Sequence, residues 1–297
     1  MVNRIPAVWE RFDDRFAFVD GDGYLDVLWD EGRWVEGPAY FPAGRYLTFS
    51  DIPNNRIMRW DETTGGVGVF RKPSEYANGH TVDRAGRLVS CEQGTRRVTR
   101  TEVDGSITVL ADRWQGKRFN SPNDVVERAD GSIWFTDPCY GIDNDYEGHR
   151  ADSEIGACHV YRIDPSGEVA TVAEDFVRPN GLAFSADEHQ LYIVDTRRKH
   201  IRRFDVKDDR LTGGEEFGTC DARSFDGIRL DRDDRVWAAA GDGVHVFDAD
   251  GTKLGKLKLP EIVSNLTFGG AKRNILFITA TTSVYAIMLN VNGVRYP

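Results

Sequence analysis

The sequence lacks any long apolar run. None of its 297 residues lies in a stretch that approaches the length of a membrane span, and the opening MVNRIPAVWERFDD lacks the apolar core of a secretion signal. We therefore expect a cytoplasmic protein with no membrane partner. Positive charge is also in deficit, because 38 Lys and Arg against 48 Asp and Glu give a net charge of -10. With no basic cluster to offset this charge, a nucleic-acid partner is disfavoured.

Cysteine is scarce, and the four cysteines form neither a CxxC pair nor a zinc-knuckle spacing. They are Cys91, Cys139, Cys158 and Cys220. The rarity of cytosolic disulfides favours reduced thiols, although Cys139 and Cys158 bracket an expected loop and leave a bridge there open. GxSxG, HExxH and GxxxxGK[ST] motifs are absent as well, which disfavours a serine hydrolase, a zinc protease or a P-loop enzyme.

What the sequence does contain is a repeat along its whole length. The aligned segments are VEGPAYFPAGRYLTFSD, ANGHTVDRAGRLVSCE, PNDVVERADGSIWFTD, PNGLAFSADEHQLYIVD, FDGIRLDRDDRVWAAA and SNLTFGGAKRNILFITA. Each has a short acid or amide near its start, then a turn and an apolar strand. These first-position residues are Glu36, Asn78, Asn123, Asn180, Asp226 and Asn265, separated by 42, 45, 57, 46 and 39 residues.

Such intervals are typical of four-stranded propeller blades, and helical periodicity is nowhere sustained. The sequence therefore predicts an all-β fold, a six-bladed β-propeller formed by residues 1–297 as one domain. Only about one strand pair follows Asn265, whereas AFVDGDGYLDVLW precedes the first unit. We expect this N-terminal strand to pair with the C-terminal strands and close the ring. The interval of 57 residues places a loop insertion at residues 140–157, either a lid at the mouth or a plain surface connection.

Equivalent residues of a propeller repeat occupy equivalent places around the axis, so the first-position side chains should converge on one volume. All six end in a carboxylate or carboxamide, and two formal charges gathered away from water are costly unless a cation lies between them. Oxygen ligands with several neutral amides favour one calcium ion, with magnesium or manganese next, and no thiolate or imidazole set argues for zinc. The alternative is that these residues serve only as turn caps.

A second column lies at the ends of the following strands. Its members are Asp51, Glu92, Asp137, Asp195, Ala240 and Ala280. We expect the acids to orient the first column or to bind backbone turns, with Asp137 and Asp195 nearest to the site.

The motifs EGP, NSPND, FTDP, PNG and FDG resemble those of the senescence-marker-protein/gluconolactonase family, also called regucalcin-like, and ANGHTVD and FTDPCYG are similar to its bacterial gluconolactonases. The resemblance implies a six-bladed propeller that hydrolyses a sugar lactone. It further implies metal ligation by Glu36, Asn180 and Asp226, with Asn123 contacting metal or substrate. Relatives have an arginine just before that asparagine, whereas this chain has Ser121 and Pro122 there.

Our hypothesis is that the metal polarises the lactone carbonyl while Asp226 activates the attacking water. His80, two residues after Asn78 on the same strand face, is the competing base. The expected substrate contacts are Asn78, Arg118, Asn120, Asn123, Asp137, Tyr140 and Asn265. A metal-dependent esterase or phosphotriesterase and a non-catalytic calcium-binding propeller are the rival functions. A monomer and a homodimer are both compatible with the sequence.

Overall fold

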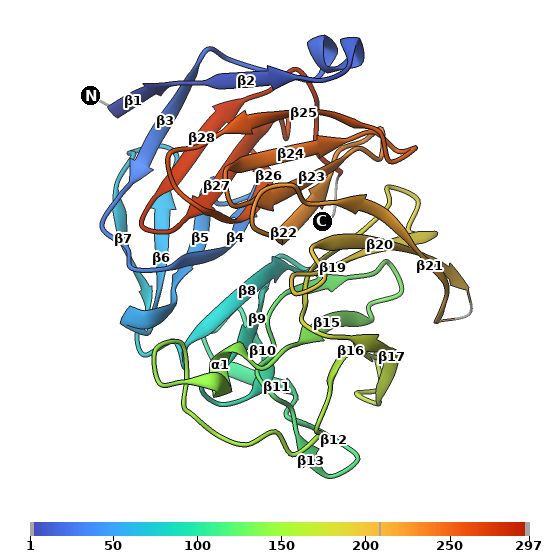
Figure 1. Cartoon of the computed structure of the whole chain (residues 1–297). Coiled ribbons are helices and arrows are strands. Elements are labelled where there is room, and N and C mark those ends of the chain that lie inside the picture. The colour runs from blue at the N-terminus through green and yellow to red at the C-terminus, as the bar shows by residue number, and fades with distance from the viewer. Residues whose placement is uncertain (1–2, 208, 295–297) are drawn as a thin grey trace.

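Six antiparallel sheets surround a common centre in the computed structural model, which describes residues 3–207 and 209–294 (Figure 1). The predicted all-β, six-bladed propeller is confirmed. The first blade contains β4 (Val35–Phe41), β5 (Tyr46–Asp51), β6 (Arg56–Asp61) and β7 (Val67–Arg71). The second contains β8 (Ala77–Val82), β9 (Leu88–Glu92), β10 (Arg97–Thr101) and β11 (Ile107–Ala111). The third contains β14 (Val125–Glu127), β15 (Ile133–Asp137), β16 (Cys158–Ile163) and β17 (Val169–Phe176).

The remaining blades are built in the same way. The fourth contains β18 (Pro179–Phe184), β19 (Gln190–Asp195), β20 (His200–Lys207) and β21 (Arg210–Thr219). The fifth contains β22 (Phe225–Leu230), β23 (Val236–Ala240), β24 (Gly243–Phe247) and β25 (Lys253–Lys258). The sixth contains β26 (Val263–Gly269), β27 (Ile275–Ala280) and β28 (Val284–Met288). Between them lie the hairpin β12 (Arg113–Trp114) and β13 (Lys117–Arg118), the helix α1 (Tyr140–Asp143), and the 3-10 helices Asp14–Phe18 and Ile52–Asn54. No helix in the described ranges is long and apolar enough to cross a membrane.

The ring is closed by the two ends of the chain, as predicted. Strand β3 (Tyr24–Trp29) pairs with β28, and β1 (Asn3–Pro6) extends the same sheet (Figure 1). The sequence did not reveal that β2 (Val8–Arg11) adds a fifth strand to the previous blade by pairing with β25. The N-terminal segment therefore ties the fifth and sixth blades together.

Large side chains fill the space between neighbouring blades. Trp134 of β15 meets Phe184 of β18 at a ring-centroid distance of 5.5 Å, and Trp237 of β23 meets Phe268 of β26 at 5.8 Å. Innermost strands such as β4 and β26 are buried along their whole length, whereas outer strands such as β11 are largely exposed. The core of each blade therefore lies toward the common centre.

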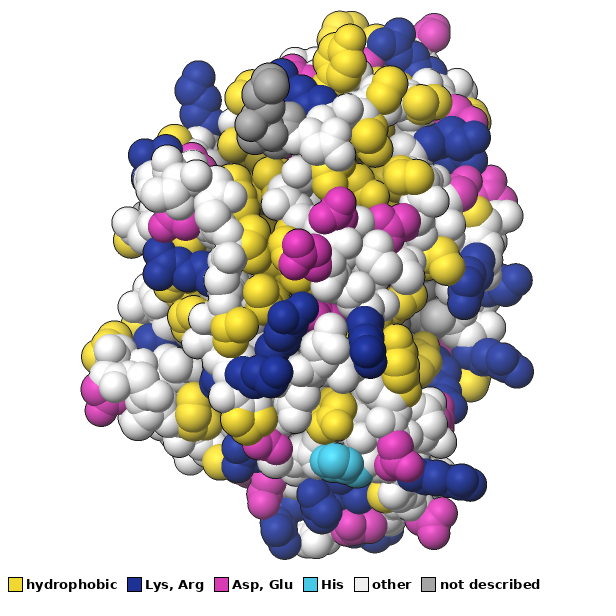
Figure 2. Space-filling model, turned by 90° about the vertical axis from the view of Figure 1, so that its left-hand side faces the viewer, with side chains coloured by type: hydrophobic (Ala, Val, Ile, Leu, Met, Phe, Trp, Pro, Cys, Tyr) yellow, Lys and Arg dark blue, Asp and Glu magenta, His cyan; other side chains and the backbone are white. Residues whose placement is uncertain are grey.

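The outer surface mixes charges of both signs. On the face shown in Figure 2, Lys and Arg side chains are interspersed with Asp and Glu and with small hydrophobic patches. This pattern agrees with the mixed charge distribution along the sequence.

Candidate active site

A cavity of about 140 Å3 lies at the end of the ring where the innermost strands begin. Five of the six first-position residues line it, although they come from parts of the chain up to 190 residues apart. The sequence-predicted residues that meet here are Glu36, Asn78, Asn123, Tyr140, Asn180 and Asp226. Ring symmetry thus gathers oxygen-bearing side chains at one mouth.

The residue after four of the first-position residues is a glycine, and packing around the axis explains why. A Cβ on Gly37 would lie 2.0 Å from the Asn78 carbonyl oxygen, and one on Gly181 would lie 2.5 Å from that of Asp226. Such distances are too short for any side chain, so the inner strand of one blade can approach the next only through glycine. The same crowding occurs at Gly79 and Gly227. The glycines therefore set how closely the site residues of adjacent blades stand.

The acids of the second column hold the loops that lead to this cavity rather than lining it. Asp51 accepts a hydrogen bond from the backbone N–H of Arg33 at 3.0 Å. Asp137 accepts one from the backbone N–H of Asn120 at 2.8 Å, and Asp195 accepts one from the backbone N–H of Val177 at 2.8 Å. In all three blades the donor lies three residues before the first-position residue. In these three blades the acid at the end of the second strand thus fixes the approach of the chain to the site, whereas Glu92 binds the side chains of Arg71 and Arg97 instead.

Two carboxyl groups, the buried Glu36 and the half-buried Asp226, give the cavity its electrostatic character. Burial raises the pKa of Glu36 to about 8, opposed by the N–H of Gly37, which donates to Glu36 Oε2 at 2.6 Å. Burial and the charge of Glu36 raise the pKa of Asp226 well above its ordinary value. Both carboxylates are therefore costly to ionise without a nearby cation.

Amide side chains orient these two acids. Asn265 does not line the cavity; its amide donates to Glu36 Oε2 at 3.1 Å. Asn180 lowers the pKa of Asp226 by a hydrogen bond and donates to Thr196 Oγ1 at 3.1 Å. The two carboxamides thus help to fix the carboxylates in place, and of the two only Asn180 lines the cavity.

The insertion at residues 140–157 contributes two side chains to the mouth. Tyr140, on α1, has a raised pKa because it is buried, and Glu147 has a pKa raised to about 7 for the same reason. Gly148 packs against Gly141, since a Cβ there would lie 2.2 Å from the Gly141 carbonyl oxygen. This contact folds the segment back over the cavity.

Several lining residues were missed by the sequence argument because they lie outside the repeat. They are Trp34, Glu147, Thr196, Arg223, Ser224, Ile262 and Val263. The one signal for Glu147 was its place in an insertion at the mouth. The others lie in loops beside first-position residues, where side chains need not match from blade to blade.

Four predicted substrate contacts do not line the cavity: Asn265, whose amide binds Glu36, and Arg118, Asn120 and Asp137. Arg118 is exposed on β13 and donates to the Thr95 carbonyl oxygen at 3.1 Å. Asn120 is buried, and its amide donates to the Asp137 carbonyl oxygen at 3.1 Å and accepts from Ser153. Burial raises the pKa of Asp137 to about 8 while its carboxylate binds the backbone of the preceding loop. Their predicted substrate contacts stay predictions, and the structure gives Asn120 and Asp137 a role in loop positioning.

His80 lies deeper on β8, beyond the cavity. Its Nε2 is 2.7 Å from Ser50 Oγ and its Nδ1 is 2.8 Å from Ser90 Oγ. Full burial, with a smaller contribution from Arg71, lowers the pKa of His80 to about 3. A base role for His80 stays a prediction that its burial and lowered pKa do not favour.

The mouth carries oxygen donors of the kind that a metal ion binds. Within residues 3–207 and 209–294, no three His, Cys, Asp or Glu side chains are grouped as a metal site. A cation at the mouth would therefore need amide oxygens beside the carboxylates of Glu36 and Asp226, and Asn123 and Asn180 offer them. Two acids among neutral amide oxygens fit a hard divalent cation.

Known proteins share this architecture. The sequence pattern of the SMP-30/Gluconolactonase/LRE-like region matches residues 34–282. The chain belongs to this family. A gluconolactonase of Zymomonas mobilis is 31% identical over 98% of this chain and 88% of its own length. A pentonolactonase, XacC, of Haloferax volcanii is 30% identical over 83% of this chain and 81% of its own length.

Solved structures of the SMP-30/gluconolactonase family superpose closely on the chain. The gluconolactonase XC5397 from Xanthomonas campestris has a TM-score of 0.92 at 38% identity, covering 97% of both chains. A regucalcin from Agrobacterium tumefaciens has a TM-score of 0.77 at 20% identity and shares the fold. The predicted family resemblance is confirmed.

Proposed function

We propose that the protein hydrolyses a sugar lactone at this mouth with the help of one divalent metal ion. Two of its relatives are a gluconolactonase and a pentonolactonase, which supports an aldonolactone as the substrate. The observation that carries the proposal is the pairing of two acids with raised pKa values, the buried Glu36 and the half-buried Asp226, among carboxamides in one cavity. An ester hydrolase needs such a charged, preorganised site at the scissile carbonyl.

Glu36, Asn123, Asn180 and Asp226 would hold the metal ion. Their all-oxygen character favours calcium, with magnesium and manganese as the next candidates. When bound, such an ion acts as a Lewis acid that polarises the ester carbonyl and stabilises the developing oxyanion.

The residues of the chain supply the remaining chemistry. The Asp226 carboxylate accepts the proton of the attacking water. Burial and the neighbouring acids raise its pKa, so the hydrogen bond from Asn180 favours the ionised form only in part, and a bound cation would have to supply the rest. The Tyr140 hydroxyl and the Asn78 amide bind hydroxyl groups of the sugar at the cavity wall. Glu147 and the insertion that carries it exclude bulk water from the reacting carbonyl.

The test combines an activity assay with a binding assay. Purified protein stripped of metal by a chelator is titrated with Ca2+, Mg2+ and Mn2+ in a calorimeter, and hydrolysis of glucono-, xylono- and galactonolactone and of an aryl phosphotriester is followed in parallel. We expect one bound ion per chain and lactone turnover that returns with it. Glu36→Gln should weaken ion binding at least tenfold, and Asp226→Asn should abolish turnover.

Glu168→Gln is the matched control, because Glu168 is an exposed acid that does not line the cavity. Wild-type turnover in Asp226→Asn would defeat the assignment of the base. Full lactone turnover in stripped protein would overturn the metal requirement, and a higher rate on the phosphotriester than on every lactone would overturn the substrate class.

A further inference from the structure

The loops that enter the fifth and sixth blades differ from those of the other four. Where the other blades carry an acid in the second column, these two carry Ala240 and Ala280. In the four acid-bearing blades the residue three positions before the first-position residue does not line the cavity at the mouth. These residues are Arg33, Glu75, Asn120 and Val177. In the two alanine blades the residues at this position, Arg223 and Ile262, both line it.

A shifted backbone hydrogen bond explains the difference. In three of the acid-bearing blades the residue after the acid donates its N–H to the carbonyl oxygen two positions before the first-position residue, as Thr196 does to Arg178 at 3.0 Å. In the fifth blade the donor Gly241 instead binds the carbonyl oxygen of Ala222, four positions before Asp226, at 3.3 Å. Three residues rather than one therefore lie between the held carbonyl and the first-position residue, and the loop bulges over the mouth.

This bulge holds Arg223 at the mouth. Its backbone lies in the left-handed region, with φ of 61°, which a residue other than glycine keeps only where its surroundings impose it. A Cβ on Gly241 would lie 2.7 Å from Arg223 Cβ, so only glycine fits beneath the arginine. Arg223 is exposed as well as lining the cavity, which places it at the outer part of the wall.

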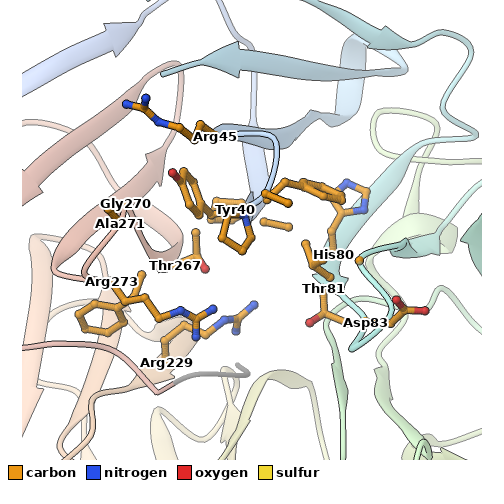
Figure 3. A pocket seen from close by; sticks show the side chains of 18 of the residues that line it. Tyr40, Arg45, His80, Thr81, Asp83, Arg229, Thr267, Gly270, Ala271 and Arg273 are labelled. Carbon is orange, nitrogen blue, oxygen red and sulfur yellow. The ribbon is translucent and has the colours of Figure 1, made fainter. Parts of the chain in front are cut away.

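The Arg223 side chain has no partner within residues 3–207 and 209–294, where its guanidinium forms neither a hydrogen bond nor an ion pair. Arginines on the wall of the larger cavity at the opposite end of the inner strands, of about 780 Å3, are different (Figure 3). Arg45 there is paired with Glu62 at 3.0 Å, and Arg229 is paired with Asp124 at 3.3 Å. Arg223 therefore keeps its donors free for a ligand at the mouth.

The other charges of the mouth favour an anionic group at Arg223. The acids on its wall, among the residues that the structure describes, are Glu36, Glu147 and Asp226. The proposed divalent ion would balance Glu36 and Asp226, and Glu147 comes from the insertion and forms no ion pair with Arg223. The fifth blade thus presents a positive side chain and the insertion a negative one, which orients a substrate whose outer end is negatively charged.

We propose that Arg223 is a specificity-determining residue that binds an oxyanionic substituent, a carboxylate or a phosphate ester, on the end of the lactone away from its carbonyl. This inference rests on the proposed lactone hydrolysis and names its substrate class as sugar lactones with a second, negatively charged group. The guanidinium binds two oxygens of such a group through parallel N–H donors. The cavity, of about 140 Å3, is smaller than the usual range of about 300 to 1,000 Å3 for ligand sites, so a terminal substituent extends outward to the arginine.

The test compares three lactones in the presence of the ion that restores turnover. They are gluconolactone, the analogue whose terminal CH2OH group is replaced by a carboxylate, and the analogue whose terminal hydroxyl carries a phosphate. At low salt we expect a lower KM for at least one charged lactone than for gluconolactone, and this advantage should shrink as salt is added. The two charged analogues distinguish a carboxylate from a phosphate ester as the preferred group.

Variants assign the preference to one side chain. Arg223→Gln should raise the KM of the preferred charged lactone about fivefold, with its kcat and the KM of gluconolactone each within about twofold of the wild type. Arg223→Lys should restore part of the preference, because lysine keeps the charge but not the paired donors. Arg33→Gln is the matched control, because Arg33 is an exposed arginine at the equivalent position of the first blade and does not line the cavity.

The outcomes separate this inference from the proposed function. An unchanged KM for both charged lactones in Arg223→Gln, or an equal loss of turnover on all three lactones, would overturn the role of Arg223 while lactone hydrolysis stands. A wild-type preference for gluconolactone over both charged analogues would do the same. If the wild type hydrolyses none of the three, both the proposed function and this inference are wrong.

Discussion

His80 should remain uncharged in the folded protein at every pH from 5 to 8. The Ser50 hydroxyl donates to the Asn78 carbonyl oxygen at 2.9 Å, so it is free only to accept from His80 Nε2. The Ser90 hydroxyl then donates to Nδ1, and the neutral ring has both nitrogens satisfied. A second proton would place a charge in a fully buried position, which is why burial lowers the pKa of His80 to about 3.

The magnitude follows from the difference between folded and unfolded chains. A histidine in an unfolded chain titrates near pH 6.5, so between about pH 6.5 and pH 3 the unfolded state binds a proton that the folded state does not. The free energy of unfolding therefore falls as the pH falls, by about 1.4 kcal/mol per pH unit below 6.5. Between pH 7 and pH 5 the loss due to His80 amounts to about 2 kcal/mol.

The assay is urea denaturation of the wild type and of His80→Gln at pH 7 and pH 5, with both proteins in the same metal-free buffer. The wild type should lose about 2 kcal/mol more than the variant over this interval. The other histidines are present in both proteins, so their contributions cancel. Equal losses would refute the reasoning, as would a native imidazole that titrates near pH 6.5 in nitrogen-15 spectra. The latter result would restore His80 as a candidate base.

Two further perturbations test the packing around the site. Gly181→Ala should lower the free energy of unfolding by about 1 to 3 kcal/mol, because the added methyl group crowds the Asp226 carbonyl oxygen, and it should lower lactone turnover at least tenfold. Gly68→Ala is the control and should change neither, because open space surrounds Gly68. Thermal melts and initial rates check both; a Gly181→Ala protein with wild-type rates would show that the spacing between blades is not critical. Oxidised glutathione should join Cys139 and Cys158, whose Sγ atoms lie 3.4 Å apart, with loss of two protons and two electrons from the thiols and reduction of the oxidant to two thiols. We expect the mass to fall by two hydrogens in the wild type but not in Cys158→Ser, and the free energy of unfolding to rise by about 3 kcal/mol. If both thiols can still be titrated after exposure to oxidised glutathione, the prediction is wrong.

The fold was predictable because its repeat is periodic in the sequence. Each blade contributes one short acid or amide at a regular interval, and the axis turns that interval into proximity, as the convergence of Glu36, Asn123 and Asp226 shows. The closing strand was predictable for a simpler reason, since the last repeat lacked strands that the first residues could supply.

The remaining site residues follow from local geometry that periodicity does not encode. Glu147 has no counterpart in other blades, and Asn265 contacts Glu36 because the sixth inner strand places its amide behind the acid rather than in the cavity. Arg118 was favoured for its nearness to Asn123 in sequence, but the β12–β13 hairpin carries it outward. Distance along a chain predicts contact poorly where the backbone reverses within a few residues.

The pairing of β3 with β28 also bears on how the chain is synthesised. More than 250 residues separate the two strands, so the N-terminal segment emerges from the ribosome long before its partner exists. Until the last strands are made, β3 presents unpaired backbone groups, and the nascent chain is open to association with other chains through that edge. Completion of the sixth blade should accordingly be the slow, late event of folding, since it requires contacts between the most distant parts of the polypeptide.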